Sequence, residues 1–411
     1  MKVLLANKYF YIKGGSERFF FNDAELLKRK GHQVIYFSML HEKNLDCPEK
    51  AEFISRIDYE NPKGIKEKLS QSLKLLYSCE ARNKIDSLLR REKPDLAHLH
   101  NIHHQISPSI IHSLKKHQVP VVMTLHDYKM VCPAYMMVRR GRVCEECGGG
   151  RYYRCFFNRC TKESYAKSLL NVFEMYLHHR LLSVYNSVDV FITPSQFLLN
   201  KLEEMGFRGF LVKLTYSFDC RECRQEYGSD GRSICYVGRL SEEKGIYTLI
   251  QAVKGLDVDL KIIGEGPEES VLRAWAREQE MTNVRFLGYL SDAALRDEVR
   301  SSSVVIVPSE WYENCPNSVM EAFALGKPVI GARIGGIPEI VKDGETGFTF
   351  IPGDAADLRS KIRLLLDQPG LMVKLGKNAR RYAEQALDPD KHYFELMKIY
   401  RMAKEMSGRK S

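Results

Sequence analysis

The chain has 411 residues, of which 44 % are hydrophobic and 28 % charged, and this length favours two domains. Its 19 phenylalanines and 21 tyrosines are too many for a disordered protein, and no run approaches the roughly 18 uncharged apolar residues that span a membrane. The net charge of +10 lies in the first half: residues 1–200 hold 31 basic and 20 acidic side chains, whereas residues 201–411 hold 31 and 32. A basic half faces nucleic acid, anionic lipid or an anionic substrate, unless it is only a solvated surface.

The predicted elements begin with a buried strand at 2–6, which is too short for the apolar core of an export signal and favours a cytoplasmic protein. A turn at Gly14-Gly15, a helix at 16–30 and a strand at 33–38 follow. Residues 62–93 have the apolar periodicity of a helix, and short strands are expected within 94–100 and 120–125. After a cysteine-rich segment, we expect a helix at 162–185 and a strand at 187–193.

The second half is more regular. Strands are predicted at 233–237, 258–263, 284–287, 304–307 and 328–330, with helices near 244–254, 268–280, 291–300 and 316–326. Strands that alternate with helices of about 10 to 15 residues are typical of βαβ units on a parallel sheet. Helices near 354–367, 370–386 and 390–406 close the chain.

We therefore predict the α/β class, with two facing Rossmann-like domains that are doubly wound around parallel sheets. Their expected bounds are 1–193 and 194–385, and the helix at 390–406 is expected to pack back on the first domain. Folds of this kind bind ligands at the carboxyl ends of their strands, so a cleft between the domains is expected there.

One motif in the second half suits a phosphate. The segment 237–245 follows a predicted strand and opens a helix, and Gly238 permits a tight turn at its start. Arg239 and Lys244 are two cations that suit the oxygens of one phosphate group. A charged loop before a capped helix is the alternative interpretation.

A second motif, 311–321, follows the buried strand 304–307. Pro316 suits the first helical position, so the amides behind it would point to the cleft and form an anion site. These amides belong to Asn317, Ser318 and Val319. Two carboxylates beside a phosphate site, Glu313 and Glu321, are expected to accept hydrogen bonds from sugar or ribose hydroxyls.

In order and spacing, these motifs resemble the retaining glycosyltransferases of family 4, which have the GT-B fold. The resemblance rests on Gly14-Gly15, His98-Leu99-His100, Thr124-Leu125-His126-Asp127, Gly238-Arg239 with Lys244, Gly264-Glu265-Gly266-Pro267, and the segment from Glu313 to Glu321. It implies a nucleotide-sugar donor, UDP- or GDP-linked, whose diphosphate is held by Arg239 and Lys244. It also implies that catalysis needs neither a metal ion nor a protein nucleophile, because these cations and the helix N-terminus stabilise the departing diphosphate.

The resemblance assigns a role to each remaining site residue. Glu321 would bind the ribose, and Glu313 would bind hydroxyls of the donor sugar. Gly15 would contact the diphosphate from the first domain. His126 would lie near the donor sugar and the acceptor, where we expect it to orient substrate rather than act as a strong base.

Five of the 11 cysteines lie close together in the chain. They are Cys132, Cys144, Cys147, Cys155 and Cys160. The odd total and the absence of an export signal argue against a disulfide framework. Four of these five thiolates would suit a structural Zn²⁺, and reduced cysteines without a ligand, disulfides or an iron–sulfur cluster are the alternatives.

The cysteine segment is also strongly cationic. It contains Arg139, Arg140, Arg142, Arg151, Arg154 and Arg159. Because it follows His126-Asp127, we interpret it as a lid on the acceptor side that holds an anionic acceptor, such as a polyprenyl-diphosphate-linked sugar.

We predict a cytoplasmic, retaining glycosyltransferase that moves a sugar from a nucleotide-sugar to a glycan or to a lipid-linked, anionic acceptor in cell-surface polysaccharide synthesis. A peripheral contact with the anionic inner face of the membrane is expected, and nucleic acid is not. The alternatives are another GT-B enzyme, such as a nucleotide-sugar epimerase or a phosphorylase, and a non-catalytic protein that binds nucleic acid or serves as a scaffold.

Overall fold

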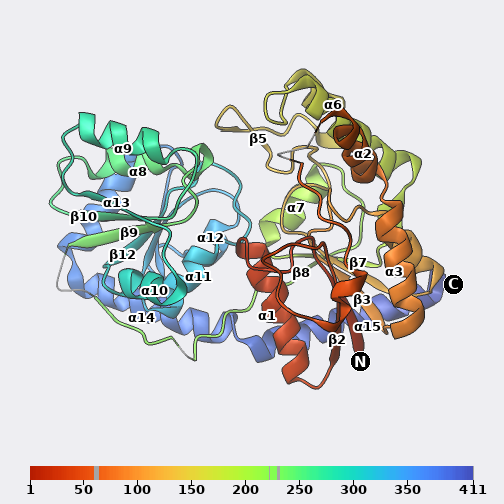
Figure 1. Ribbon diagram of the computed structural model, residues 1–411. Helices are drawn as coiled ribbons and strands as arrows, with labels where there is room; N and C mark the ends of the chain where they lie inside the picture. Colours follow the sequence, from red (N-terminus) through yellow and green to blue (C-terminus); the bar gives the residue numbers. More distant parts are fainter. Residues whose placement is uncertain (60–63, 222, 229–231, 411) are drawn as a thin grey trace. The chain divides into compact units, whose positions relative to one another are not determined.

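The computed structural model describes residues 1–59, 64–221, 223–228 and 232–410, which form two compact units (Figure 1). Unit 1 comprises Met1–Met136, Glu145–Thr215 and His392–Ser411, and unit 2 comprises Met137–Cys144 and Tyr216–Lys391. No helix in the described ranges is long and apolar enough to cross a bilayer.

Unit 1 is built on a parallel sheet of six described strands in the order β2-β1-β3-β4-β7-β8. The strands are β1 Lys2–Ala6, β2 Gln33–Phe37, β3 Leu96–Leu99, β4 Val121–Thr124, β7 Val190–Thr193 and β8 Leu211–Lys213. Every residue of β3, β4 and β7 is buried, as expected for strands whose two faces are both covered. The strand order changes direction between β1 and β3.

The helices of unit 1 cover this sheet and build a smaller layer beyond it. They are α1 Gly15–Arg29, α2 Ile65–Leu76, α3 Cys79–Glu92, α4 Ser109–Lys116, α5 Tyr153–Phe157, α6 Tyr165–Tyr176, α7 Gln196–Glu204 and α15 Pro389–Lys410. Leu396 and Tyr400 of α15 belong to the same buried cluster as Leu5 of β1 and Phe20 of α1. The last helix therefore completes the core around the first strand.

Short elements connect these helices. They are the 3₁₀ turns Pro48–Glu52, Gly148–Gly150 and Val184–Ser187, and the π-helical turn η3 Leu177–Leu181, which follows α6 directly. The antiparallel hairpin of β5 Val138–Arg139 and β6 Arg142–Val143 lies in the stretch that groups with unit 2.

Unit 2 has a second parallel sheet of six described strands, in the order β11-β10-β9-β12-β13-β14. The strands are β9 Ser233–Val237, β10 Asp259–Ile263, β11 Val284–Gly288, β12 Val304–Val307, β13 Val329–Ala332 and β14 Gly347–Phe350. The helices are α8 Ile246–Val253, α9 Glu269–Glu278, α10 Asp292–Arg300, α11 Asn317–Ala324, α12 Ile337–Ile340, α13 Ala355–Asp367 and α14 Pro369–Ala386, and the 3₁₀ turn Glu242–Lys244 precedes α8.

The structure confirms the predicted α/β class with two doubly wound parallel sheets. It also has elements that were not expected, such as α4, α7 and β14, and three other differences change the organisation of unit 1. The stretch 62–93 is two helices, α2 and α3, and its first two residues lie outside the described ranges. The helix expected at 162–185 ends at Tyr176 and continues as η3. Strand β8, which lies beyond residue 193, pairs with β7 and so belongs to the first sheet.

Candidate functional site

In unit 2, the two predicted donor motifs begin where the strand order changes direction. The neighbouring strands β9 and β12 end at Val237 and Val307, and their next partners lie on opposite sides. In sheets of this kind, ligands bind at the carboxyl ends of the two strands where the order reverses. The loops 238–245 and 308–316 follow these strands, and the amide of Glu310 donates to the carbonyl of Glu243 at 2.9 Å. The two motifs are therefore neighbours at the place where such sheets bind ligands.

A short ion pair joins these loops. Nζ of Lys244 lies 2.6 Å from Oε1 of Glu313 and 4.9 Å from the centre of the Trp311 ring. The hydroxyl of Ser309 donates to the same carboxylate oxygen at 2.7 Å. Burial pushes the pKa of Glu313 upward, but the Lys244 ammonium and these hydrogen bonds hold it below its usual range. Glu313 is therefore a buried carboxylate that stays ionised.

Two glycines fix the backbone around this pair. A Cβ on Gly264 would lie 2.0 Å from the carbonyl oxygen of Gly238, and a Cβ on Gly335 would lie 2.2 Å from that of Glu313. Both glycines have a positive φ, +134° and +61°, that other residues rarely adopt. The segment 264–267 is thus packed backbone to backbone against the loop that starts at Gly238.

The N-terminus of α11 follows the Glu313 loop. Pro316 precedes the helix, and the Val319 amide donates to the Pro316 carbonyl at 3.1 Å. This bond leaves the amides of Asn317 and Ser318 at the open end of the helix, where an anion is favourable. Glu321 lies half-buried on the same helix.

Arg239 is the exposed cation of the donor motif. It lies directly after Gly238, and the Tyr236 hydroxyl donates a hydrogen bond of 2.8 Å to the Arg239 carbonyl oxygen. Its guanidinium is therefore placed by a fixed backbone but remains open to a ligand at this edge of the sheet. Ser309 was not identified from the sequence as a residue of this site. Its position just after the buried strand β12 could have indicated it.

In unit 1, histidines gather at the carboxyl ends of β3 and β4. His98 is fully buried, with Nδ1 2.9 Å from the Tyr400 hydroxyl and Nε2 2.7 Å from the Thr124 hydroxyl. Nδ1 of His100 lies 3.0 Å from Nε2 of His126, and the two rings stack with centres 5.2 Å apart. Burial lowers the pKa of His126 to about 3 and that of His100 well below its usual range, so both rings are neutral at pH 7.

The ring nitrogens of His100 and His126 make one hydrogen bond. Each neutral ring carries a single hydrogen, so one of the two nitrogens, Nδ1 of His100 or Nε2 of His126, donates and the other accepts. Nε2 of His100 is buried and has no hydrogen-bond partner within the described chain. The bond holds the His126 ring against His100, and the role of His126 toward a substrate stays a prediction.

Gly15 begins α1, close after the end of β1 in the chain, with Gly14 in an extended conformation before it. It is half-buried. The contact of Gly15 with a diphosphate held by unit 2 stays a prediction.

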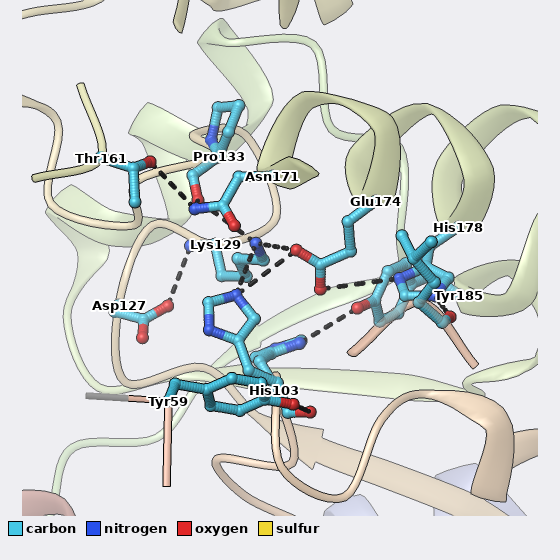
Figure 2. Close-up of polar contacts among 12 residues, drawn as sticks. Tyr59, His103, Asp127, Lys129, Pro133, Thr161, Asn171, Glu174, His178 and Tyr185 are labelled. Carbon is cyan, nitrogen blue, oxygen red and sulfur yellow. Dashed lines mark hydrogen bonds and ion pairs between the residues drawn. The ribbon is translucent and has the colours of Figure 1, made fainter. Parts of the chain in front are cut away.

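Behind the His126 loop lies a buried ionic network that sequence reasoning missed (Figure 2). Nζ of Lys129 is 2.6 Å from Oε2 of Glu174 on α6, and the two side chains are 3 % and 0 % exposed. Nε2 of His104 lies 3.4 Å from the same oxygen. The amide of Lys129 donates to Asp127 at 2.9 Å, which connects this network to the residue after His126. The lysine and the glutamate are 45 residues apart, and no local pattern pairs them.

Three of the five clustered cysteines share one small apolar cluster. Cys147 and Cys155 are buried there with Tyr152 of the same segment, and Cys160 packs against them. None of the 11 cysteines, all within the described ranges, forms a disulfide. Zinc on these thiolates stays a prediction.

Another group in unit 1 has the residue types of a metal site. Ligand atoms of Asp23, His98 and His100 lie within 4.8 Å of one another. Both nitrogens of His98 are already hydrogen-bonded, and Asp23 accepts a hydrogen bond from His392 at 3.0 Å. His98 and Asp23 are therefore engaged in the polar core, whereas Nε2 of His100 has no hydrogen-bond partner among the described residues.

Two family models together match most of the chain. The model of glycosyltransferase family 4 matches residues 13–213, and the model of glycosyl transferases group 1 matches residues 221–382. The chain is a member of glycosyltransferase family 4. The matched ranges contain Gly15 and His126 in the first model and every donor-motif residue in the second.

Relatives and solved structures agree with this family. An uncharacterized glycosyltransferase from Methanocaldococcus jannaschii is 28 % identical over 48 % of this chain and only 55 % of its own length. An uncharacterized protein from the cps region of Klebsiella pneumoniae is 25 % identical over 83 % of this chain and 87 % of its own.

Among solved structures, sucrose-phosphate synthase from Thermosynechococcus elongatus superposes with a TM-score of 0.72 at 17 % identity and covers 97 % of this family 4 chain and 98 % of its own. Anabaena HepE in complex with UDP-glucose superposes with a TM-score of 0.65 at 17 % identity. The match covers 97 % of this chain and 99 % of the HepE chain. These likenesses show the GT-B fold.

Proposed function

We propose that this family 4 member is a retaining glycosyltransferase that uses a nucleotide-diphosphate-sugar as donor. The observation that carries the proposal is the Lys244–Glu313 pair, which lies beside the α11 N-terminus at the switch point of the second sheet. A cation and open amides suit a diphosphate, and an ionised buried carboxylate suits sugar hydroxyls. HepE was solved with UDP-glucose, which supports a uridine nucleotide over a guanosine one.

In this proposal, each residue acts on charge or orientation. Cleavage of the bond between the anomeric carbon and the phosphate leaves negative charge on the diphosphate, and Arg239 and Lys244 stabilise that charge. The amides of Asn317 and Ser318 add to this effect. Glu313 orients the donor sugar through its hydroxyls.

The remaining roles follow the family resemblance. Glu321 binds the ribose, and Gly15 contacts the diphosphate. His126 orients the donor sugar or the acceptor, and its low pKa makes it a poor base at pH 7. The departing phosphate oxygen takes the acceptor proton, so no protein nucleophile is assigned.

The acceptor is proposed to be a glycan or a lipid-linked, anionic sugar in cell-surface polysaccharide synthesis. The +11 charge of residues 1–200 supports an anionic acceptor, and Arg151, Arg154 and Arg159 of the cysteine segment support its place on the side of unit 1. The relative from the Klebsiella cps region supports the setting.

Calorimetric titration of the full chain with UDP, and then with GDP, tests the donor site. Arg239→Ala and Glu321→Ala should each weaken nucleotide binding about tenfold or more, because each removes a charged hydrogen-bond partner. The matched controls are Arg277→Ala and Glu278→Ala, two exposed charges of α9 outside the site. Unchanged affinity in both site variants would contradict the site assignment.

Product analysis tests the reaction class. We expect release of nucleoside diphosphate that depends on an added acceptor, and a product whose anomeric configuration, read by NMR, matches the donor. Release of the nucleotide without sugar transfer, or formation of an epimeric donor, would favour another GT-B enzyme. Binding to polynucleotide without donor turnover would favour a non-catalytic protein.

A further inference from the structure

Two adjacent helices of unit 1 expose large apolar side chains in rows. The six side chains, which we call the apolar face, are Ile65, Leu69 and Leu73 on α2 and Tyr165, Leu169 and Phe173 on α6. Each is more than half exposed, from 53 % to 84 %. A spacing of four residues places side chains on one side of a helix, so each helix presents one apolar stripe to solvent.

The two stripes belong to one region of the molecule. Helix α2 packs beside α6, as Figure 1 shows. Nε2 of His178, in the turn after α6, lies 2.6 Å from the carbonyl of Leu76 at the end of α2. Phe157 of α5 and Leu181 of η3 are 65 % and 77 % exposed on elements that pack against α6. Exposed apolar patches of this extent mark interaction sites in soluble proteins.

The surroundings of the apolar face are basic. Exposed cations on or next to the same helices are Lys66, Lys68, Arg154, Arg159, Lys162 and Lys167. Glu163 is an exposed acid among them, whereas Glu67 is half-buried and Glu174 is fully buried in its pair with Lys129. Apolar side chains rimmed by lysine and arginine are the pattern of helices that lie in the interface of an anionic bilayer.

We propose that the apolar face and its basic rim dock unit 1 onto an anionic lipid bilayer. The stripes enter the boundary between headgroups and acyl chains, and the lysines and arginines contact the anionic headgroups. The inference extends the proposed function, because a lipid-linked acceptor is presented at such a surface.

Charge favours a bilayer over a second copy of this chain as the occupant. A two-fold dimer places the same patch on both partners, so the basic rims would face each other and repel. Anionic headgroups neutralise the same rim and gain the apolar burial as well.

Flotation of the full chain with vesicles tests this surface without donor or acceptor. Vesicles of equal parts phosphatidylglycerol and phosphatidylcholine should bind the protein, and pure phosphatidylcholine should bind it about tenfold less. Leu69→Gln/Leu169→Gln should lower binding to the anionic vesicles about tenfold or more, and so should Lys68→Glu/Lys167→Glu. The matched control is Val271→Gln/Phe394→Gln, two side chains that are 60 % and 61 % exposed elsewhere.

Three outcomes would overturn the inference: no binding to the anionic vesicles, equal binding to both kinds, or an equal loss in the control variant. Light scattering tests a fourth outcome that would overturn it. If the wild type is a dimer and the Leu69→Gln/Leu169→Gln variant is a monomer, the apolar face is a self-association surface. Calorimetry with UDP separates this inference from the proposed function. Vesicle binding without nucleotide binding would refute the donor site and leave the surface standing.

Discussion

Glu313 is a carboxylate that burial would neutralise and that Lys244 keeps charged. Because the folded-state pKa is lowered, the pair's contribution to stability is present above the ordinary glutamate pKa and is lost as the pH falls through the lowered one. The pair is therefore intact at neutral pH, where the proposed donor would bind.

Replacement of Lys244 by methionine should leave Glu313 buried without its cation. We expect a loss of about 1–3 kcal/mol in the free energy of unfolding at pH 7, since both groups keep some solvent contact. The loss should shrink toward pH 4, because Glu313 of the variant no longer has its cation and takes up a proton there. Urea denaturation at both pH values measures it, and Lys244→Met/Glu313→Gln should recover most of the stability. An equal loss at pH 4 and pH 7 would contradict the charge argument.

Gly264 offers a backbone test at the same site. Gly264→Ala places a Cβ 2.0 Å from the Gly238 carbonyl, so the donor loop must move. We expect about 3 kcal/mol or more of destabilisation and weaker UDP binding. Gly255→Ala is the control, because Gly255 also has a positive φ, +69°, but nothing lies within 4 Å of its Cβ position. That variant should lose only about 1–2 kcal/mol, and equal losses would show that backbone strain alone decides both.

Among the elements, α6 is tied to the loop after His126 through the Lys129–Glu174 pair. Lys129→Met should cost about 3–5 kcal/mol, because it leaves a fully buried carboxylate with only histidine partners. Lys129→Met/Glu174→Leu should recover most of that loss, since two apolar groups replace the two charges. Chemical denaturation of the wild type, both single variants and the double variant forms the cycle that measures the coupling. Additive losses would show that the two residues do not interact.

The sequence predicts the elements that have strong local patterns. Continuous apolar runs such as 304–307 indicate strands buried on both faces, and the structure has β12 at those residues. The three-residue strand β8 is too short to show a pattern, and β7 and α15 decide its place. The end of α6 at Tyr176 is equally hidden, because no glycine or proline follows it and the chain continues as the π-helical turn η3.

In the candidate site too, residues with a local sequence signal could be predicted and residues paired only by the fold could not. Lys244 and Glu313 are identified by their places after two strands, because the carboxyl ends of β9 and β12 meet at one edge. Lys129 and Glu174 could not be paired in advance, because only the folded chain brings them together. The apolar face was missed for a similar reason: a helical stripe in the sequence predicts a buried face, and only the structure shows that this one is exposed.

At the scale of the whole molecule, the chain leaves unit 1 for the main part of unit 2 after Thr215 and returns to unit 1 at His392. These two positions are hydrogen-bonded, since Nδ1 of His392 lies 2.9 Å from the Thr215 carbonyl and Nε2 lies 3.0 Å from Asp23 on α1. Burial acts to lower the pKa of His392, but Asp23 and the carbonyl raise it above its ordinary value. The contribution of this contact is therefore complete below the ordinary histidine pKa and is lost as the pH rises through the raised one.

His392→Gln should lower the unfolding free energy of unit 1 by about 1–2 kcal/mol at pH 6 and by less at pH 9, where the wild type has lost the imidazolium. Hydrogen exchange of the α15 amides at both pH values measures the change. Lys398→Ala, on the exposed side of the same helix, is the control and should leave exchange unchanged. Faster exchange in the control would mean that α15 is loosened by any substitution.

The position of α15 in the core of unit 1 has a consequence for biosynthesis. The ribosome makes β1 before nearly all of unit 2 and α15 after it. The cluster that surrounds Leu5 therefore lacks Leu396 and Tyr400 until α15 has been made, although unit 2 is by then almost entirely synthesised. Unit 2 is thus able to fold during synthesis before unit 1 is complete.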